Sequence, residues 1–466
     1  MTLPAKFVER VLRDLGGTEG AALCAALDAE PPVSVRLNPA KTGADTLPAG
    51  PDAGLPALAI AGRVPWSRDG RYLAVRPSFT LDPDFHAGAY YVQEASSQFV
   101  GHLLAAVRTE GARILDLCAA PGGKTTLYAS LAGPDGLVVA NEIDRRRASV
   151  LADNVRKWGT GNVAVTTCEP RALGDFEAWF DVVAVDAPCS GEGMFRKDPD
   201  ARGEWSEGNV KQCAARQDEI LREAWRALRP GGTLVYSTCT FNRDEDEGAL
   251  ERMAAWAGDE IAESEETAVE DAWGIVCGRV GAFRTFRFYP HRTCGEGFFA
   301  AVARKSFDAG GRVRAPKARR TVFAAVDRKT AGELARWVRN PGGMRFAAVA
   351  DTCYAWYAAQ ADAVRTLSEA LPVIYSGVAL GQVFKGVLKP DPALAFFDGL
   401  NRGALPAAEL DDEETLRFLR RQDIAAGGLA EGMNLVCSRG RALGFAKRIG
   451  ARVNNLYPNS LRIIKQ

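Results

Sequence analysis

The alternation of apolar and polar residues divides the chain into regions with different patterns. In residues 1–30, apolar side chains recur at helical spacing from Phe7 to Leu15 and stop at Gly16, which predicts helices. The segment PPVSVRLNP (31–39) predicts a short strand between prolines. Residues 40–70 are rich in Pro, Gly and Ala, so we expect loops over a small domain there.

A different pattern begins near residue 90, where short apolar runs alternate with helical periods. Strands are predicted at 112–118, 136–142, 162–168, 181–186 and 231–239, and helices at 124–132, 144–159 and around 209–229. Apolar strands that alternate with helices are typical of a parallel sheet covered on both faces. The sequence therefore predicts an α/β fold with a doubly wound, Rossmann-like sheet.

The end of this central region changes character twice. Residues 243–271 hold twelve acidic residues against two arginines, which predicts an exposed helix and loop. The segments FRTFRFYP (283–290) and GFFAAVARK (297–305) then predict an antiparallel hairpin that closes the sheet.

The remainder of the chain is basic and mixed in pattern. RVRAPKARR (312–320) is either a linker or a segment that contacts nucleic acid. From about residue 321 the pattern predicts a mixed α+β region with short strands, as in 372–386. We therefore expect three domains, at 1–88, 89–307 and 308–466.

Composition narrows the class of protein. The chain has 466 residues, of which 47% are hydrophobic and 25% charged, as in ordinary globular proteins. It has neither a membrane-spanning run nor a signal peptide at its N-terminus, so we expect a cytoplasmic protein. Ten dispersed cysteines are then free thiols, and without CxxC pairs or clustered histidines we expect no metal site.

Charge is distributed unevenly although the net charge is zero. Residues 301–466 contain 26 Lys and Arg against 15 Asp and Glu, a net charge of +11, so residues 1–300 carry −11. Such asymmetry favours a polyanionic partner for the basic part. Ordinary solvated surface charge explains the count equally well at this point.

ILDLCAAPGGKTT (114–126) reads as strand, tight loop and helix, where backbone N–H groups attract negative charge and glycines let a ligand approach closely. It lacks the glycine of the phosphate-binding loop and the GxGxxG dinucleotide pattern. Asp116 enters the loop and Glu142 ends the next strand, where a carboxylate can accept ribose hydroxyls. A phosphate-free nucleoside such as S-adenosylmethionine fits this pattern, and an ordinary turn with two solvated acids is the alternative.

Two cysteines follow strands in a similar way. Cys189 stands in VAVDAPCSGEGMFRKDP (183–199) and Cys239 in LVYSTCT (234–240), each just beyond a predicted parallel strand. If those strands are neighbours, both thiols face one pocket at the edge where ligands bind in open α/β sheets. Arg196 and Lys197 could lower a thiol pKa there.

A thiolate beside a methyl donor suits methylation of an unactivated pyrimidine carbon. C5 of cytosine becomes nucleophilic only after something adds to C6, and a cysteine can make that addition. Asp186, at the N3/N4 edge of the ring, would favour the addition and select cytosine. One cysteine would add and the other would assist release, whereas buried inert thiols are the alternative.

These motifs together resemble a known family. DLCAAPGGKTT, ANEIDRRR, DAPCSGEGMFRKDP and STCTFNRDEDE, in this order, are similar to the RNA 5-methylcytosine methyltransferases of the NOL1/NOP2/Sun group. GEGMFRKD, SVRLNP (34–39), YYVQEASS (90–97) and GFAKRIGARVNNLYPNSLRI resemble the bacterial 16S ribosomal RNA methyltransferases of the RsmF (YebU) type. The similarity extends over nearly the whole chain and is weakest at 40–70 and 243–275.

The resemblance implies roles for individual residues. Cys239 would be the nucleophile and Cys189 would assist product release, a ranking that spacing alone does not supply. The donor contacts implied are Glu142, Asp186 and the loop residues Cys118, Ala119, Ala120, Pro121, Gly122, Gly123 and Lys124. Glu169 stands where the family often has Asp, so its contact on the adenine side is the least secure of the set.

The resemblance also implies partners and architecture. It implies S-adenosyl-L-methionine as cofactor, a class I methyltransferase sheet, and a PUA-like RNA-binding module in the basic C-terminal region. The partner would be 16S ribosomal RNA or the small ribosomal subunit, with no membrane involved, and we expect a monomer. His291 is expected to be structural. Transfer RNA as the substrate, or a non-catalytic ribosome-assembly factor, are the alternatives left open.

Overall fold

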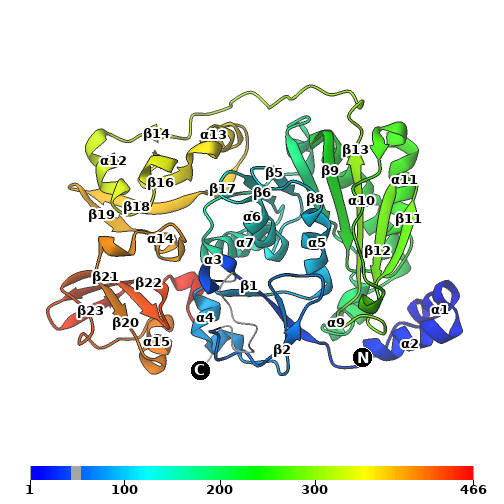
Figure 1. Ribbon diagram of the computed structural model, residues 1–466, viewed down its shortest axis with the longest axis horizontal. Coiled ribbons are helices and arrows are strands. Elements are labelled where there is room, and N and C mark those ends of the chain that lie inside the picture. The colour runs from blue at the N-terminus through cyan, green and yellow to red at the C-terminus, as the bar shows by residue number, and fades with distance from the viewer. Residues whose placement is uncertain (1, 44–53, 465–466) are drawn as a thin grey trace.

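The computed structural model describes residues 2–43 and 54–464 and is built around one large mixed sheet (Figure 1). Five parallel strands form its centre in the order β7-β6-β5-β8-β9. They are β5 (Arg113–Asp116), β6 (Leu137–Asn141), β7 (Val163–Thr166), β8 (Phe180–Asp186) and β9 (Leu228–Thr238). All five lie where the apolar runs predicted strands, so the doubly wound sheet is confirmed.

Antiparallel strands extend the sheet at both ends. Beyond β9 lie β13 (Phe298–Lys305), β12 (Phe283–Phe288) and β11 (Val276–Val280), with β10 (Ile261–Ala262) also paired to β13. The predicted hairpin is thereby confirmed as β12–β13. At the other end β17 (Val373–Ser376), from the C-terminal region, pairs with β7. Sequence patterns did not indicate this connection between the two regions.

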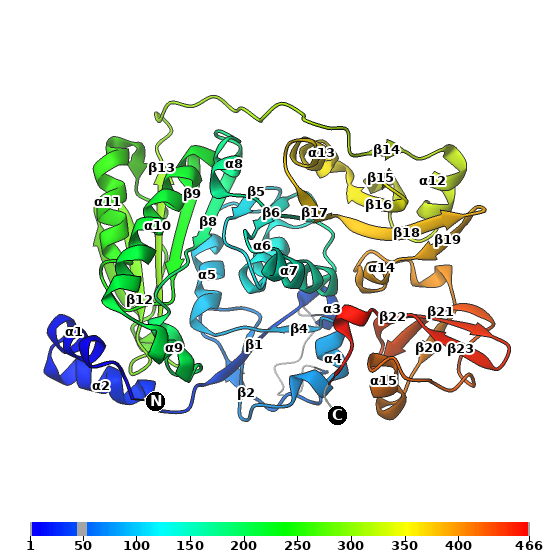
Figure 2. The same ribbon diagram turned by 180° about the vertical axis from the view of Figure 1, so that it is seen from behind.

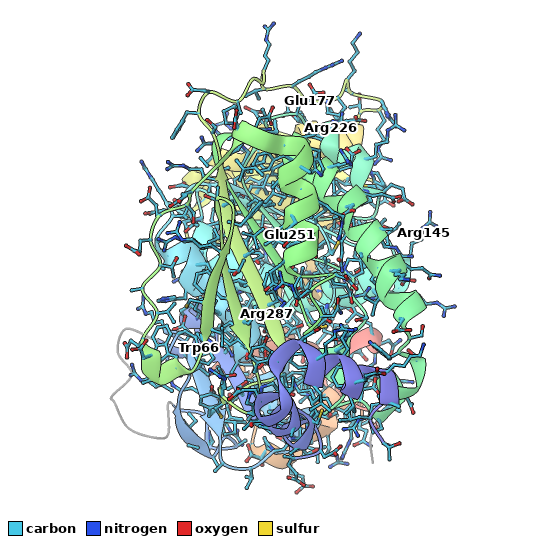
Figure 3. The ribbon with its side chains drawn as sticks, turned by 90° about the vertical axis from the view of Figure 1, so that its right-hand side faces the viewer. Trp66, Arg145, Glu177, Arg226, Glu251 and Arg287 are labelled. Carbon is cyan, nitrogen blue, oxygen red and sulfur yellow. The ribbon has the colours of Figure 1, made fainter. Side chains whose placement is uncertain are left out.

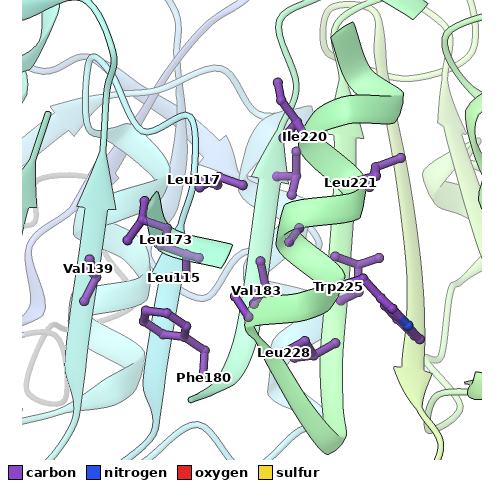
Figure 4. Close-up of a cluster of buried hydrophobic side chains, with 14 of the residues drawn as sticks. Leu115, Leu117, Val139, Leu173, Phe180, Val183, Ile220, Leu221, Trp225 and Leu228 are labelled. Atoms are coloured by element: carbon purple, nitrogen blue, oxygen red, sulfur yellow. The ribbon is translucent and has the colours of Figure 1, made fainter. Parts of the chain in front are cut away.

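Helices cover both faces of the sheet, as the continuous apolar strands require. One face packs against α5 (Phe99–Ala105), α6 (Gly123–Ala132) and α7 (Arg145–Trp158), and the other against α8 (Pro170–Gly174), α10 (Glu207–Ala227) and α11 (Glu247–Ala257). Ile114 and Leu115 are neighbours on β5 and enter the two different cores, since successive strand residues point to opposite faces. Figure 4 shows the core under α10.

The N-terminal residues form two separate parts. Helices α1 (Ala5–Leu15) and α2 (Gly17–Leu27) pack through Phe7 against Phe195 and Trp205 of the central domain. Figure 3 looks onto this side of the molecule, with the two helices below Arg287 of β12. The helices predicted for residues 1–30 are thus confirmed.

A four-stranded sheet follows, in the order β2-β3-β1-β4, with short helices beside it. Its elements are β1 (Val33–Leu37), α3 (Pro39–Thr42), β2 (Ile60–Arg63), β3 (Gly70–Leu73), α4 (Pro83–His86) and β4 (Tyr90–Val92). The expectation of loops throughout 40–70 was wrong for α3, for β2 and for the first residue of β3. Asn38 caps α3, and pairing with β3 and β1 stabilises strands of weak sequence signal. Residues 44–53 of that prediction lie outside the described residues.

The C-terminal region contains two further sheets, which lie beside one another at the end of the molecule far from α11 (Figures 1 and 2). One sheet has the order β14-β15-β16-β18-β19 and the other the order β20-β21-β22-β23. The elements are β14 (Ala324–Ala325), α12 (Arg328–Ala335), β15 (Met344–Val349), β16 (Thr352–Tyr357), α13 (Ala361–Ala370), β18 (Val378–Phe384), β19 (Val387–Pro390), α14 (Pro392–Phe396), β20 (Ala407–Glu409), α15 (Asp412–Leu419), β21 (Gly432–Ser438), β22 (Arg441–Ile449) and β23 (Arg452–Asn455).

The structure bears on two predictions about surface segments. Residues 306–323 cross between the domains as an extended segment, in which Arg312, Arg314 and Lys317 are exposed. The acidic segment 243–271 is not uniformly exposed, because Glu245 and Asp246 are fully buried. Glu245 accepts a hydrogen bond from the Ser190 backbone, and Asp246 binds Thr238 of β9 and Arg287 of β12, so both acids are buried although the charge run predicted exposure. No helix in the described ranges is long and apolar enough to cross a membrane.

Candidate active site

Cys189 and Cys239 lie next to each other at the carboxyl edge of the central sheet. Strands β8 and β9 are adjacent and parallel, with Asp186 opposite Ser237, so the loops that follow them emerge side by side. The two sulfur atoms are 3.1 Å apart. The expectation that both thiols face one site therefore holds in the structure, and it depended on strand adjacency that sequence could not establish.

The contact makes the two thiols unequal. The pKa of Cys189 is raised well above its usual value, first by the hydrogen bond with Cys239 and then by burial. The backbone N–H of Cys239 donates to Cys189 Sγ at 3.4 Å, which opposes this rise without reversing it. A thiol held in its protonated form can donate to a neighbouring sulfur, so this arrangement keeps the proton on Cys189 and makes the Cys239 sulfur its acceptor.

The positive charge beside the cysteines comes from the donor loop. Lys124 Nζ lies 2.9 Å from Asp186 Oδ2 and interacts electrostatically with Cys239. Burial opposes the charge on Lys124, but the Asp186 carboxylate outweighs it and the lysine pKa is raised. Lys124 therefore stays protonated where a thiolate would form.

Arg196 and Lys197 do not serve this purpose, contrary to the sequence-based expectation. Both lie 3.8 Å from the buried carboxylate of Glu296. Arg196 also donates to the backbone carbonyls of Ala29, Glu30 and Gly295. Because these contacts anchor the loop after Cys189 to the segment before β13 and to the segment after α2, the two cations are structural.

Asp186 connects the thiols to the donor pocket. Its Oδ1 accepts a hydrogen bond from Ser237 Oγ at 2.7 Å, and its Oδ2 binds Lys124. About a third of the side chain stays exposed. The carboxylate is thus fixed in orientation by two partners while one side remains open to a ligand.

A pocket of about 170 Å³ adjoins this carboxylate. The loop 116–124 forms one wall and the segment 91–97 the other, with Asp116, Cys118, Ala119, Ala120, Pro121, Gly123, Lys124 and Asp186 among the lining residues. Gly122, with φ of 112°, shapes the turn, and a side chain there would meet Leu151 at 3.0 Å. Six of the seven predicted loop residues line the pocket, and Gly122 forms its turn.

Asp116 and Cys118 are buried ionisable groups in the wall of this pocket. Asp116 accepts a hydrogen bond from Thr125 Oγ1 at 2.6 Å, whereas its Oδ1 has no partner among the described residues. Burial raises the pKa of Asp116 to about 7. Burial, followed by the charges of Asp116, Asp186 and Glu142, also raises the pKa of Cys118, so this thiol stays neutral.

Glu142 and Glu169 lie at the ends of β6 and β7, at the same edge of the sheet. Glu142 is buried, accepts a hydrogen bond from the backbone N–H of Asp144 at 3.0 Å and pairs with Arg147 at 3.2 Å. Glu169 is exposed and precedes α8 without capping it. Neither side chain lines the 170 Å³ pocket itself.

These residues fit S-adenosylmethionine. The loop offers no cluster of cations for phosphates, and carboxylates at the ends of successive strands suit the hydroxyls and amino groups of a nucleoside. The unpartnered Asp116 Oδ1 and the acidic surroundings suit a cationic ligand rather than an anion. No group of His, Cys, Asp and Glu suitable for a metal ion occurs among residues 2–43 and 54–464.

Glu245 is a site residue that sequence reasoning missed. Its carboxylate accepts hydrogen bonds from the Ser190 backbone at 2.9 Å, from Gln217 Nε2 at 3.0 Å and from Asn242 Nδ2 at 2.7 Å. Its charge also contributes to the raised pKa of Cys189. The sequence signals were its position six residues after Cys239, inside an acidic run, and its place in the STCTFNRDEDE motif.

Glu192, in the loop after Cys189, is also a buried acid. It accepts hydrogen bonds from the Phe241 backbone and from Trp205 Nε1, both at 2.9 Å, and pairs with Arg10 of α1. Helices α1 and α2 thereby hold the loop that carries Cys189. His291 binds Glu19 of α2 at 2.8 Å, so its expected structural role agrees with its position.

Family models match three parts of the chain. The model of the 16S rRNA methyltransferase RsmB/F matches residues 103–304, and that of the N-terminal domain of 16S rRNA methyltransferase RsmF matches 3–95. The methyltransferase RsmF PUA domain matches 406–463. The last match covers β20–β23 and α15, so it locates a PUA domain in the final sheet of the molecule.

Individual relatives agree with these matches. Ribosomal RNA small subunit methyltransferase F of Shewanella loihica is 32% identical over 418 residues, covering 85% of this chain and 83% of its own. The Escherichia coli O127:H6 protein of the same name is 33% identical over 425 residues, covering 85% and 84%. A crystal structure of a methyltransferase homologue from Pyrococcus horikoshii is 27% identical, covers 65% of this chain and all of its own, and has a TM-score of 0.52. The chain therefore belongs to the family of small-subunit ribosomal RNA methyltransferases of the RsmF type.

Proposed function

We propose that this protein transfers a methyl group from S-adenosylmethionine to C5 of cytosine in 16S ribosomal RNA through a covalent adduct with Cys239. The observation that carries the proposal is the pair of sulfur atoms 3.1 Å apart, beside Asp186 and the donor pocket that it lines. An enzyme that methylates oxygen or an exocyclic nitrogen needs no paired thiols at that edge.

Cys239 begins the reaction as a thiolate stabilised by Lys124 and by the Cys189 thiol. Its sulfur adds to C6 of the ring, and the electron pair of the C5–C6 double bond makes C5 nucleophilic. Asp186 accepts a hydrogen bond from the N4 amino group and fixes the ring, which selects cytosine over uracil. The cofactor supplies an electrophilic methyl group on its sulfonium sulfur, which C5 takes up.

Release regenerates the aromatic ring. The C5 proton passes to solvent, its electron pair restores the C5–C6 double bond, and the bond from C6 to the Cys239 sulfur breaks. We assign Cys189 to this step because its thiol, kept protonated by its surroundings, can donate a hydrogen bond to the departing sulfur 3.1 Å away. Glu245 and Glu192 position the loop for this purpose.

The regions on either side of the catalytic domain support a choice of substrate. The family acts on small-subunit ribosomal RNA, and a PUA domain with a C-terminal net charge of +11 supports RNA as the partner. We propose that residues 1–88 and 308–466 hold the RNA around a catalytic domain at 89–307, and that the protein acts as a cytoplasmic monomer. The intact thiol pair and donor pocket argue against the alternative that the protein is a non-catalytic assembly factor.

Two cysteine variants test the chemistry. Cys239→Ala should abolish methyl transfer, whereas Cys189→Ala should accumulate a protein–RNA adduct that survives denaturation. The measurement is transfer of labelled methyl groups to small ribosomal subunits from cells lacking the gene, with denaturing gels to detect the adduct. Normal turnover by Cys189→Ala without any adduct would contradict the division of labour.

Bisulfite sequencing of 16S and transfer RNA from cells with and without the gene tests the substrate. Loss of cytosine marks in 16S RNA alone is the expected result. Loss of a transfer-RNA mark with unchanged 16S RNA would keep the chemistry and replace the substrate, and no change in either would favour the assembly-factor role.

A further inference from the structure

A second pocket lies next to the donor pocket and has no part in the reaction described above. It measures about 340 Å³ and opens between the N-terminal sheet domain and helix α7. Its lining combines aromatic side chains with two cations and one amide: Phe79, Phe85, Tyr90, Tyr91, Trp158, Arg76, Lys157 and Asn154. We propose that this pocket binds an unstacked nucleobase of the RNA strand outside the target cytosine, a proposal that rests on the RNA substrate proposed above.

Of the aromatic side chains, Phe85 and Tyr91 offer partly exposed rings on which a base can stack. Phe79, Tyr90 and Trp158 are buried, whereas Phe85 and Tyr91 are only partly covered. The rings of Phe79, Phe85 and Tyr90 contact one another, with centroids 6.0–6.5 Å apart. Proteins recognise single-stranded RNA chiefly by stacking bases on such rings, and a pocket of this volume accommodates one nucleotide.

Two cations at the pocket lack acidic partners. The Arg76 guanidinium lies 5.4 Å from the Phe79 ring centroid, and Lys157 Nζ lies 4.4 Å from that of Phe85. Within residues 2–43 and 54–464 neither side chain forms an ion pair, and burial lowers the pKa of Lys157 to about 8 against the charge of Asp153. Cations beside aromatic rings suit a nucleotide, because the base stacks on a ring and the phosphate pairs with a cation.

Asn154 gives the pocket a polar group for the base edge. Its Nδ2 donates to the Pro121 carbonyl at 2.8 Å and to Tyr91 Oη at 3.4 Å. These bonds fix the amide orientation, and within the described ranges its Oδ1 accepts no hydrogen bond. An oriented acceptor at a stacking surface suits the exocyclic amino group of adenine, cytosine or guanine.

The position of the pocket links the active site to the C-terminal modules. Tyr91 and Val92 line both this pocket and the donor pocket, and Tyr91 Oη donates to Pro121 of the donor loop at 3.2 Å. Beyond the Lys157 carbonyl, which Lys41 binds, lies a third pocket of about 390 Å³ where the N-terminal domain meets the C-terminal sheets. Its charged lining residues are Lys41, Arg339, Arg402, Arg441 and Asp398. Successive cationic pockets in this direction follow the course a bound RNA strand would take toward the PUA domain.

Three substitutions test the pocket without touching the catalytic groups. Arg76→Glu, Lys157→Gln and Phe85→Leu remove, one at a time, each cation and the partly exposed ring. Loss of one stacked base weakens RNA binding about 5- to 150-fold, so we expect Phe85→Leu to raise KM for small ribosomal subunits within that range and the two cation variants to raise it as well. The kcat and the KM for S-adenosylmethionine should stay within about twofold of wild type.

Arg222→Glu is the matched control. Arg222 is an exposed arginine on α10, over the Trp256 ring, so it has a similar setting on the opposite side of the sheet. A KM for subunits that rises equally in Arg222→Glu would show a general charge effect and overturn the proposal. So would unchanged KM in all three pocket variants, or a parallel rise in KM for S-adenosylmethionine.

Binding measurements separate this inference from the proposed function. Fluorescence anisotropy with a labelled single-stranded RNA, and ultraviolet crosslinking of 16S RNA containing 4-thiouridine, need no methyl transfer. Crosslinks to the peptide 76–92 are expected. Wild-type protein that binds RNA there but does not methylate it would refute the proposed function and keep the pocket. Variants that lose subunit binding but keep full affinity for free 16S RNA would point to a ribosomal protein and overturn the nucleobase assignment.

Discussion

Asp116→Asn should stabilise the ligand-free protein at neutral and alkaline pH while weakening its affinity for the methyl donor. The Asp116 carboxylate is fully buried, with Thr125 Oγ1 bound to one oxygen and no partner for the other among the described residues. An Asn side chain has the same shape, keeps an acceptor for Thr125 and carries no charge. The substitution therefore removes the cost of burying a charge and little else.

The magnitude follows from the pKa. Burial raises the pKa of Asp116 from 3.8 to about 7, with the charges of Asp186 and Glu142 adding to the effect and Thr125 and Lys124 opposing it. The folded protein thus binds the proton more tightly than the unfolded chain. The stability that this proton contributes is then fully present below about pH 4 and is lost as pH rises from about 4 to about 7. The full difference of about 3 pKa units corresponds to about 4 kcal/mol.

The assay compares thermal unfolding of wild type and Asp116→Asn between pH 5 and pH 8.5, without ligand. For a cooperative unit of 150–250 residues, 1 kcal/mol shifts Tm by about 2–4 °C, so the variant should melt about 10 °C higher at pH 8. The two proteins should converge as pH falls toward 4. Isothermal titration with S-adenosylmethionine at pH 8 should show weaker binding by the variant, because Asp116 lines the donor pocket.

A Tm difference that is independent of pH would refute this reasoning, because the stabilisation would then not come from ionisation. Thr125→Val is the matched control, since it removes the hydrogen bond that lowers the pKa of Asp116. Thr125→Val should therefore lower Tm at pH 8, where Asp116→Asn raises it, and this decrease should become smaller as pH falls.

Three further predictions concern other parts of the molecule. Glu245→Gln should lower the pKa of Cys189 by removing a negative charge, so the pH profile of adduct release should shift to lower pH in single-turnover assays; an unshifted profile would contradict the electrostatic role. Arg10→Met should lower kcat and reduce stability by about 3–5 kcal/mol, because it leaves Glu192 buried without its cation, yet leave the donor Kd unchanged by titration. Arg452→Ala should reduce the slope of log RNA affinity against log salt by about 1, measured by filter binding, since this exposed arginine of β23 is predicted to contact phosphate.

Much of the central domain was predictable because each element there has a local cause. The helix predicted at 144–159 is α7, which begins after the capping side chain of Asp144 and ends at Gly159 with φ of 84°. The five buried strands lie at the predicted positions since their apolar runs suit a sheet covered on both faces. Weak strands such as β2 escaped prediction because partners distant in sequence stabilise them.

The candidate site was predictable only in part. The donor loop, Asp186 and both cysteines follow strand ends, a position that sequence reveals and that the structure brings to one edge. Charge runs were a poor guide, since Arg196 and Lys197 serve Glu296, and Glu245 is buried beneath the active-site loops. Net charge was likewise no guide to individual residues, since Arg448 of the basic region donates to the backbone carbonyls of Ala426 and Leu429.

The sequence by itself determined the order of strands and helices, the residue types at each strand end and hence the class of chemistry available. Tertiary structure decided which strand ends are neighbours, and so placed the Cys189 and Cys239 sulfur atoms 3.1 Å apart. It also decided which thiol keeps its proton and which cation, Lys124, faces the other. The physical reason is that pairing across a sheet and electrostatic coupling depend on distances between residues far apart in the chain, which local patterns do not encode.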